Sequence, residues 1–387
     1  MLLCKIIANF HYNTISNMHD ITAADIQAPE KGKRILALDV MRGMTIALMI
    51  VVNNSGGPES YIQLQHSVWN GMTLCDLVFP FFLFIMGVTT YLSLSKNGFK
   101  REGKTIVKIF RRTVSILLVC WFLHWFDNVC AGKGWLDFIS LRLTGVLTRI
   151  ALCYCIMSLM ALYMSRKAIV IAGIILLVVY GALLLLFNGY NNDLTNVNAV
   201  VDRWLLPEGN LYTKKAIDPE GLLATLSAVA HTIIGFCCGW LIKRKVSLDS
   251  RLLDLFVCGV MLICVGLLVS IGLPINKRIW SPSYVLVSCG IACALLATLS
   301  YFIDLHGYRK SFTFFETFGV NPLFLYVLAE AFGTAAGYSG ITDVVYEGIN
   351  TLIPSPCFAS LVYSLLLLMV MAAIAYPLYR KRIYIKL

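Results

Sequence analysis

Apolar residues in this 387-residue chain gather in long, nearly unbroken runs and do not alternate with polar residues as in a half-buried strand. A helix needs about 20 mostly apolar residues to cross the hydrocarbon of a bilayer, and ten runs approach that length. They lie at residues 35–54, 74–95, 113–127, 144–163, 169–187, 222–242, 252–272, 284–304, 319–337 and 358–379. The pattern predicts an all-α, polytopic transmembrane helix bundle with about ten spans.

The composition favours the same class. Apolar residues make up 58% of the chain and charged residues 14%, whereas soluble domains average roughly 45–50% and about 25%. We therefore expect a cytoplasmic tail at 1–34 and one transmembrane domain at 35–387. The first thirty residues carry neither an unbroken apolar segment nor a small-residue cleavage site, which argues against a signal peptide.

The net charge of +11 suggests orientation in the membrane and not a nucleic-acid partner. Lys and Arg concentrate beside the apolar runs, as cytoplasmic loops require. If both termini are inside, 23 of the 32 basic residues fall on the inside and seven on the outside. The bias predicts an N-in, C-in topology. The outside loops are long and rich in Trp, Asn, Gly and Pro, so we expect the working face to be extracytoplasmic.

Several classes of chemistry lack their motifs. The thirteen cysteines are scattered, mostly within apolar runs, without the spacing of a zinc site or a disulfide framework. A P-loop, a dinucleotide-binding glycine motif and a nucleophile elbow are also missing from the sequence. No metal is expected, and ATPase and serine-esterase mechanisms are disfavoured.

Charged residues inside the first run are candidate functional groups, because ionisable side chains are expensive in hydrocarbon. Asp39 and Arg42 are three residues apart and share a helix face. They either neutralise each other or place Arg42 on a phosphate, whose oxygens a guanidinium contacts through two nitrogens. Asn53 follows roughly 16 Å farther along the helix axis, about the reach of a pantetheine arm.

His66 is predicted at the outer membrane surface, one short loop beyond Asn53. An imidazole there can act as a general base near neutral pH, although a lone exposed histidine is more often incidental. The rivals are His124, whose aromatic neighbours indicate an interfacial anchor, and His231, which resembles a helix-packing residue.

Other polar residues fall near the ends of the runs. Asp76 and Arg149 have a structural interpretation as an ion pair, since intramembrane charges usually pair. As functional candidates, Arg149 joins Asp39 and Arg42 among the cofactor-binding residues. The substrate-binding candidates are Trp69, Asn70, Asp76 and Asn321.

Two consecutive blocks carry a family resemblance. LALDVMRGMTIALMIVVNNSGG, followed by LQHSVWNGMTLCDLVFPFFLFIMG, closely resembles the heparan-alpha-glucosaminide N-acetyltransferase family and its bacterial relatives, within the transmembrane acyltransferases. The blocks GVLTRIALCY, DPEGLLATLSA, LPINKRIWSPSYV and GVNPLFLYV continue the likeness in family order. The chain differs by two extra residues between Asn53 and His66.

The resemblance implies a function. It implies transfer of acetyl from cytosolic acetyl-CoA to the amine of a glucosamine-type sugar on the far side of the membrane, in a multi-pass protein of the bacterial inner membrane that forms a homodimer. It places the family's catalytic histidine on His66 and its asparagine on Asn53. Both a ternary complex and a transient acetyl-histidine remain open. A transporter of sugars or organic acids, with Asp39, Arg42 and Glu330 as coupling charges, is the alternative.

Overall fold

The protein is described here by a computed structural model that covers residues 35–138, 140–212 and 216–385. The expected tail at 1–34 lies outside the described residues, as do Lys214, Lys215 and Lys386. The described chain is almost entirely helical. Its α-helices are α2 (Leu36–Asn53), α3 (Leu74–Lys96), α4 (Gly103–Cys130), α5 (Val146–Tyr163), α6 (Arg166–Leu186), α7 (Val197–Leu205), α8 (Thr225–Ile242), α9 (Leu248–Val269), α10 (Pro282–Ser300), α11 (Thr313–Val320), α12 (Pro322–Tyr338), α13 (Ile341–Leu352) and α14 (Pro356–Arg380).

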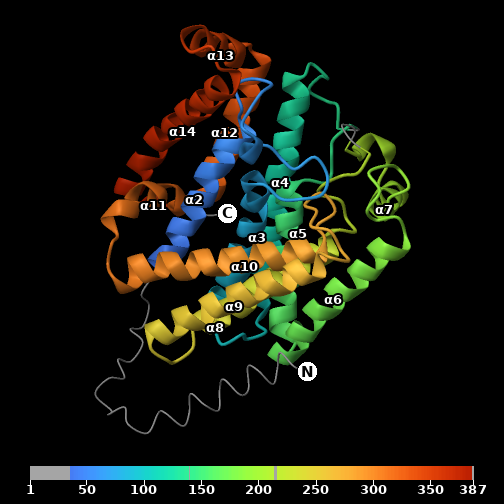
Figure 1. Ribbon diagram of the computed structural model, residues 1–387, viewed down its shortest axis with the longest axis vertical. Coiled ribbons are helices and arrows are strands. Elements are labelled where there is room, and N and C mark those ends of the chain that lie inside the picture. Colours follow the sequence, from blue (N-terminus) through green and yellow to red (C-terminus); the bar gives the residue numbers. More distant parts are fainter. Residues whose placement is uncertain (1–34, 139, 213–215, 386–387) are drawn as a thin grey trace.

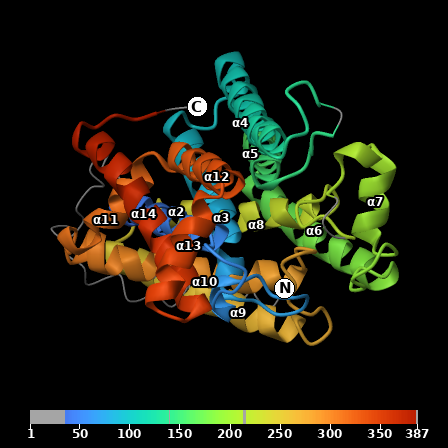
Figure 2. The ribbon, with the colours of Figure 1, turned by 90° about the horizontal axis from the view of Figure 1, so that it is seen from above.

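Short helical turns complete the described chain. They are η2 (Ile62–Leu64), η3 (Glu208–Asn210), η4 (Tyr301–Leu305) and η5 (Lys310–Phe312). In Figure 1, α8, α9 and α10 run side by side, and Figures 1 and 2 both place α7 and α11 on opposite sides of the molecule. The predicted all-α, polytopic bundle is confirmed.

The number of spans differs slightly from the expectation of about ten. Within the described residues, eight helices are long and apolar enough to cross a membrane. A ninth span results if Lys310–Val320 and Pro322–Tyr338, which meet at a 73° bend, are counted as one broken span. Helix α4 covers the expected run at 113–127 but is not among them. The chain is an integral, multi-pass membrane protein.

Helix ends at this bundle fall into two groups. We call one of them the "basic end"; it contains the loops near residues 96–103, 163–166, 242–248 and 305–313. Two contacts join helix ends there. The Leu36 N–H donates to Asp304 (3.2 Å), and Arg101 donates to the Leu162 carbonyl (2.7 Å). At the opposite "His66 end", the Gly71 N–H donates to the Ile275 carbonyl (2.8 Å). The loops thus alternate between two ends as the apolar runs predict.

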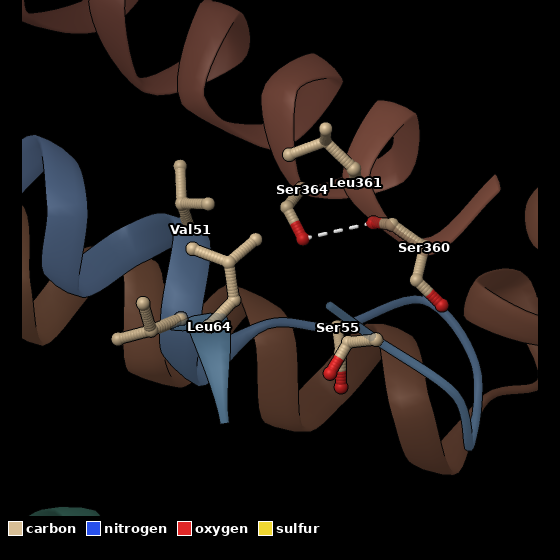
Figure 3. A pocket seen from close by; sticks show the side chains of 8 residues that line it. Val51, Ser55, Leu64, Ser360, Leu361 and Ser364 are labelled. Atoms are coloured by element: carbon tan, nitrogen blue, oxygen red, sulfur yellow. Dashed lines mark hydrogen bonds between the residues drawn. The ribbon is translucent and has the colours of Figure 1, made fainter. Parts of the chain in front are cut away.

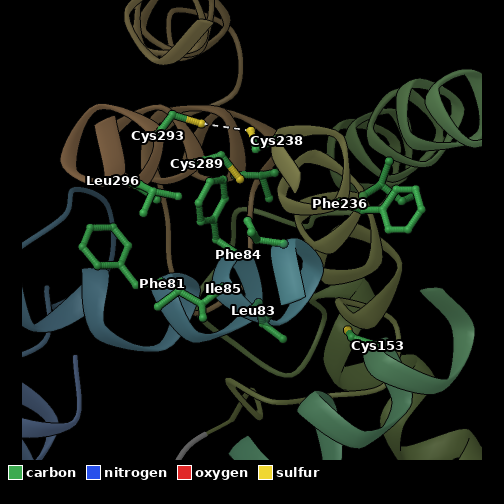
Figure 4. Packing of buried hydrophobic residues seen from close by; sticks show 14 of the residues in the cluster. Phe81, Leu83, Phe84, Ile85, Cys153, Phe236, Cys238, Cys289, Cys293 and Leu296 are labelled. Atoms are coloured by element: carbon green, nitrogen blue, oxygen red, sulfur yellow. Dashed lines mark hydrogen bonds between the residues drawn. The ribbon is translucent and has the colours of Figure 1, made fainter. Parts of the chain in front are cut away.

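The core is formed by α2, α3, α8 and α10, and the other helices surround them. About two-thirds of the apolar windows of α2 and α8 are buried (67% each), against 28% for α6 and 17% for α9, so α6 and α9 present most of their surface to the bilayer. Figure 4 shows Phe84 of α3 pointing toward Cys289 of α10. The Cys238 and Cys293 thiols face each other at 3.3 Å as free cysteines. Cysteines here behave as small apolar residues.

Glycines allow the closest helix crossings. A Cβ atom at Gly43 of α2 would lie 1.7 Å from the Phe315 carbonyl oxygen, and one at Gly319 of α11 would lie 1.9 Å from the Asp39 carbonyl oxygen. Backbones that approach this closely are typical of small-residue contacts between membrane helices. The broken span α11–α12 is therefore pressed against α2 at the level of Asp39 and Arg42.

Candidate active site

His66 lies on the loop between α2 and α3 and pairs with a buried carboxylate. Its Nδ1 atom is 2.7 Å from Oδ1 of Asp76. The His66 side chain is 47% exposed, whereas that of Asp76 is fully buried. When Nδ1–H donates to a carboxylate, the neutral imidazole carries its lone pair on Nε2. The pair thus prepares an exposed histidine to accept a proton through Nε2.

The local sequence explains why Asp76 is held in place. Thr73 and Asp76 form a reciprocal capping box at the start of α3. The Asp76 Oδ2 atom accepts from the backbone N–H groups of Thr73 (3.0 Å) and Ser67 (3.1 Å). One carboxylate oxygen therefore caps the helix and holds the residue after His66, while the other faces the imidazole.

Pro80 leaves the carbonyl of Asp76, in the first turn of α3, open to a partner outside the helix. Pro80 lies four residues after Asp76 and has no N–H, so the Asp76 carbonyl lacks its helical donor. The buried Tyr284 hydroxyl of α10 donates to that carbonyl at 2.5 Å. The first turn of α3, and with it the carboxylate behind His66, is braced against α10.

Cys75 is a neighbour of His66 that the sequence did not single out. Its Sγ atom is 3.3 Å from Nδ1 and 3.8 Å from Nε2 of His66. The thiol is free and buried, and it packs against the imidazole. Its position directly before Asp76 was the only sequence signal for this contact.

Trp69 and Asn70 hold the His66 loop against two other loops. The Trp69 indole N–H donates to the Tyr190 carbonyl (2.9 Å). The Asn70 Oδ1 atom accepts from Asn276 (3.2 Å), beside the isolated bridge between Gly71 and Asn276. In both predicted substrate-binding residues, a side-chain polar group therefore bonds a neighbouring loop and positions the His66 loop.

Asn53 ends α2 at the His66 end and contacts a different partner. Its Nδ2 atom donates to Oε1 of Glu330 on α12 at 2.7 Å. In the described part of the chain, Asn53 and His66 do not hydrogen-bond to each other. The loop between them is anchored to α14, because Ser364 donates to the Asn54 carbonyl (2.7 Å) and Ser360 to the Glu59 carbonyl (2.5 Å).

The anchored loop closes a small recess. Figure 3 shows Leu64 and Val51 packed on one side and Ser360 and Ser364 of α14 on the other, with Ser55 between them. The recess holds about 10 Å³, room for a single water. It serves to position the His66 loop and is too small for a substrate.

At the basic end, Asp39 and Arg42 form the ion pair that the sequence left open. Arg42 Nη1 is 2.9 Å from Asp39 Oδ1 and 3.5 Å from the Gly319 carbonyl oxygen. Asn321, at the helix break beside this pair, donates to the Ile383 carbonyl and accepts from the Ile385 N–H, both at 2.8 Å. Asn321 thus holds the C-terminal segment and lies far from His66 along the bundle.

The structural alternative for Asp76 and Arg149, an ion pair between them, is wrong. Asp76 is occupied by His66, and Arg149 donates through Nη2 to the Gly221 carbonyl (2.9 Å) and packs 5.0 Å from the Trp280 ring. Arg149 is 1% exposed, and its Nε and Nη1 atoms have no hydrogen-bond partner in the described part of the chain. It lies in the first turn of α5, toward the His66 end, whereas Arg42 lies toward the basic end.

A second polar cluster lies at the His66 end and was missed by the sequence analysis. Arg142 contacts Asp218 at 2.6 Å and Glu220 at 3.0 Å, and Lys277 lies 3.9 Å from Glu220. Burial alone raises the pKa of Glu220, but Lys277 and Arg142 outweigh it and hold that pKa below its usual range. The block DPEG at 218–221 was the only sequence signal. The cluster fixes the loops before α5 and α8 together.

The competing histidines have structural surroundings. His124 Nδ1 is 2.7 Å from the Arg142 carbonyl oxygen. His231 is fully buried and packs edge to face with Trp280 at 5.9 Å. His11 and His19 lie outside the described residues. Of the described histidines, His66 is the one that combines exposure with a buried carboxylate partner.

Comparison with known proteins now bears on this site. Residues 34–203 match the family model of the heparan-alpha-glucosaminide N-acetyltransferase catalytic region. The heparan-alpha-glucosaminide N-acetyltransferase of Homo sapiens is 27% identical over 365 residues, which cover 77% of this chain and 53% of the human protein. The Mus musculus protein of the same name is 27% identical over 373 residues, which cover 80% of this chain and 55% of the mouse protein. This chain is thus similar to the heparan-alpha-glucosaminide N-acetyltransferases.

The chain spans about half the length of these relatives. The segment that matches the N-acetyltransferase family model contains the whole His66–Asp76 arrangement, together with Asn53, Arg42 and Arg149. Glu330 and Asn321 lie beyond it. The part of the chain that matches the family model therefore includes the residues that build the histidine–carboxylate pair.

Proposed function

We propose that this protein transfers an acetyl group from acetyl-CoA to the amine of a glucosamine-type sugar, across the membrane in which it is embedded. The observation that carries the proposal is the His66–Asp76 pair, an exposed imidazole held by a buried carboxylate at 2.7 Å. It lies in the segment that matches an N-acetyltransferase catalytic region. The acetyl donor, the acceptor and the orientation in the membrane are parts of the proposal.

His66 acts as the general base. Its Nε2 atom accepts the proton of the acceptor amine as the amine nitrogen attacks the thioester carbonyl carbon. A C–N bond forms, the C–S bond breaks, and CoA leaves as a thiolate that takes up a proton. Asp76 keeps the imidazole in the productive tautomer and stabilises the imidazolium. In a two-step variant, His66 Nε2 attacks the thioester first and then passes the acetyl group to the amine.

Asn53 stabilises the negative charge that develops on the thioester oxygen. A preorganised donor of this kind contributes about 2.7–4 kcal/mol to the transition state. Asn53 has two amide hydrogens, and Glu330 accepts one of them at 2.7 Å. That contact orients the amide and leaves the second hydrogen for the oxyanion.

The donor enters from the basic end, which the charge bias places in the cytoplasm. Arg42, held by Asp39 at 2.9 Å, contacts a phosphate of CoA. Arg42 and Asn53 lie on the same helix, α2, roughly 16 Å apart along its axis. A pantetheine arm that follows α2 therefore brings the thioester from the Arg42 level to the Asn53 level.

The decisive experiment replaces His66 with alanine. A general base contributes about 10²–10⁴-fold, so His66→Ala should lose at least about a hundredfold of the transfer rate while retaining its fold, because the side chain is half exposed. The assay supplies acetyl-CoA labelled in the acetyl group to inside-out vesicles and measures covalently labelled amino sugar.

His124→Ala is the matched control, since His124 bonds a backbone carbonyl outside the proposed chemistry. It should retain most of the transfer rate. If His66→Ala transfers acetyl within a few-fold of the parent, the proposed base is wrong. If the parent moves unmodified sugar and yields no labelled product, the protein is a transporter.

A further inference from the structure

An open pocket at the basic end is not used by the proposed function. Its volume is about 240 Å³, and it lies where the turn after α3, the α5–α6 junction and α8 meet. Six of the eight lining residues are apolar, and the lining contains a single guanidinium, that of Arg166. The walls are formed by Phe99, Ala161, Leu162, Met164, Ser165, Arg166, Ile169 and Phe236.

The cation in the lining is Arg166, the first residue of α6. Its guanidinium carbon lies 6.0 Å from the Tyr91 ring centre and 5.8 Å from that of Trp240. Within the described ranges, no carboxylate lies at ion-pair distance from Arg166. By contrast, the neighbouring Arg244 is paired with Asp254 at 2.5 Å. Arg166 is thus an oriented and exposed positive charge without an acidic partner among the described residues.

A second guanidinium borders the pocket. Arg101 donates through Nε to the carbonyl of the pocket residue Leu162 at 2.7 Å, and its guanidinium lies 5.1 Å from the Tyr163 ring centre. One of its nitrogens is therefore committed to the backbone, while the charge itself stays at the rim. The pocket therefore combines mainly apolar walls with one lining cation, Arg166, and has a second, Arg101, bonded to one of its lining residues.

The position of the pocket in the bundle indicates what fills it. It lies between the ends of α3, α5, α6 and α8, which are all long and apolar enough to span a membrane, and so at the level of lipid headgroups. From the pocket, α6 presents a continuous apolar face that the protein leaves uncovered. That face consists of Val170, Ile171, Ile174, Ile175, Val178 and Val179.

We propose that the pocket binds the phosphate headgroup of an anionic glycerophospholipid, with Arg166 as the principal contact and one acyl chain along the exposed face of α6. Basic pockets between transmembrane helices on the cytoplasmic side bind anionic headgroups in this way. A drug-sized ligand needs roughly 300–1,000 Å³, so a pocket of about 240 Å³ suits a headgroup better than a whole CoA molecule.

The test measures lipid retention by the full-length protein. Purified protein is mixed with phosphatidylglycerol or with phosphatidylcholine of the same acyl chains, and bound lipid is counted by native mass spectrometry. The parent should prefer phosphatidylglycerol, and Arg166→Gln should weaken that preference about tenfold, since a charge-assisted phosphate contact is lost. Arg166→Lys should restore part of it.

Lys167→Gln is the matched control, because it removes the same charge from the next residue, which does not line the pocket. It should lose less of the preference than Arg166→Gln does, because Lys167 contributes only a general surface charge. The proposal fails if Arg166→Gln and Lys167→Gln lose the same amount, or if free CoA displaces the lipid, which would assign the pocket to the acetyl donor.

A measurement on the parent protein tests the proposal even if a variant does not fold. Phosphatidylglycerol should raise the unfolding temperature Tm more than phosphatidylcholine does, because a ligand that binds only the native state stabilises it. Equal shifts in Tm for the two lipids overturn the proposal. The outcome is separate from the proposed acetyl transfer, which takes place at the His66 end.

Discussion

Asp76 performs two tasks, and they can be separated by substitution. Its Oδ1 atom faces His66, and its Oδ2 atom caps α3. Asp76→Asn should reduce the transfer rate strongly, because an amide cannot stabilise the imidazolium or enforce its tautomer as a carboxylate does. It should also cost about 0.5–2 kcal/mol of stability through the weakened cap.

Thr73→Ala is the control for Asp76→Asn. It removes the threonine side of the capping box but leaves the contact between Asp76 and His66. We expect a similar loss of Tm with nearly normal transfer kinetics. If the two variants lose the same fraction of activity, Asp76 serves the helix end and not the imidazole. Transfer rates and Tm measured on both variants decide this.

Asp202 of α7 predicts a pH dependence of stability. Burial raises its pKa from 3.8 to about 6, although the Leu222 N–H, which donates to it at 2.8 Å, opposes the shift. The folded state therefore binds this proton more tightly than the unfolded state. The contribution of Asp202 is most favourable at low pH and is lost as the pH rises from about 4 through about 6, by at most about 3 kcal/mol. Asp202→Asn should remove this part of the pH dependence, as measured by Tm between pH 4 and 7.5. Parallel curves for parent and variant would contradict the assignment.

At the scale of elements, the crossing of α2 with α11 depends on two glycines. Gly319→Ala places a Cβ atom 1.9 Å from the Asp39 carbonyl oxygen, so one helix must shift. Overpacking of this kind costs about 1–3 kcal/mol or more. Because the displaced residues lie next to Arg42, we also expect weaker CoA binding, measured by calorimetry together with Tm.

Gly337→Ala is the matched control on the same broken span, because a Cβ atom there meets nothing within 4 Å. It should leave CoA affinity unchanged and stability equal or higher, since alanine is the better helix former. Equal effects of the two substitutions would show that the close crossing is unimportant.

The broken span bears on the transporter alternative. Many transporters have broken helices in corresponding positions of two halves. The described residues contain one bent helix pair, α11–α12, which meets at Asn321.

At the scale of the whole molecule, the charge bias predicts the orientation in the membrane. The structure groups the loops into two ends, and the loops richer in Lys and Arg all lie at the basic end. A reporter fused after Lys386 should therefore be cytoplasmic, and one inserted in the loop at 188–221 should be extracytoplasmic. Labelling of the 96–112 loop by an impermeant reagent added from outside would reverse the orientation and undermine the proposed direction of transfer.

Much of the fold was predictable because the length of an apolar run is a local property. Every expected run coincides with a helix, including the one now seen as the bent pair α11–α12. The short helices α7 and α13 were expected as loops. They are amphipathic, with little buried surface, and apolar length does not detect such segments.

The candidate site was predicted less completely. His66 was selected because loop position and residue chemistry are visible in the sequence. Its partner was not, because the sequence offered only an alternative pairing of Asp76 with Arg149, and residues so far apart in sequence carry no local sign of their contacts. Trp69, Asn70 and Asn321 were selected as polar residues near membrane ends, but their partners at Tyr190, Asn276 and the C-terminal backbone are set by chain crossings far apart in sequence.

The sequence by itself determined the helices, their alternation between two ends and the exposed histidine, because hydrophobic length, charge bias and helix capping act over a few to twenty neighbouring residues. Only the tertiary structure decided which polar groups meet. An unpaired polar group costs free energy in hydrocarbon, so buried donors and acceptors are stabilised by hydrogen bonds. Which partner lies within reach depends on the helix crossings. The crossing of α3 with α10 places Tyr284 on the Asp76 carbonyl, the crossing of α2 with α12 places Glu330 on Asn53, and no local pattern encodes either contact.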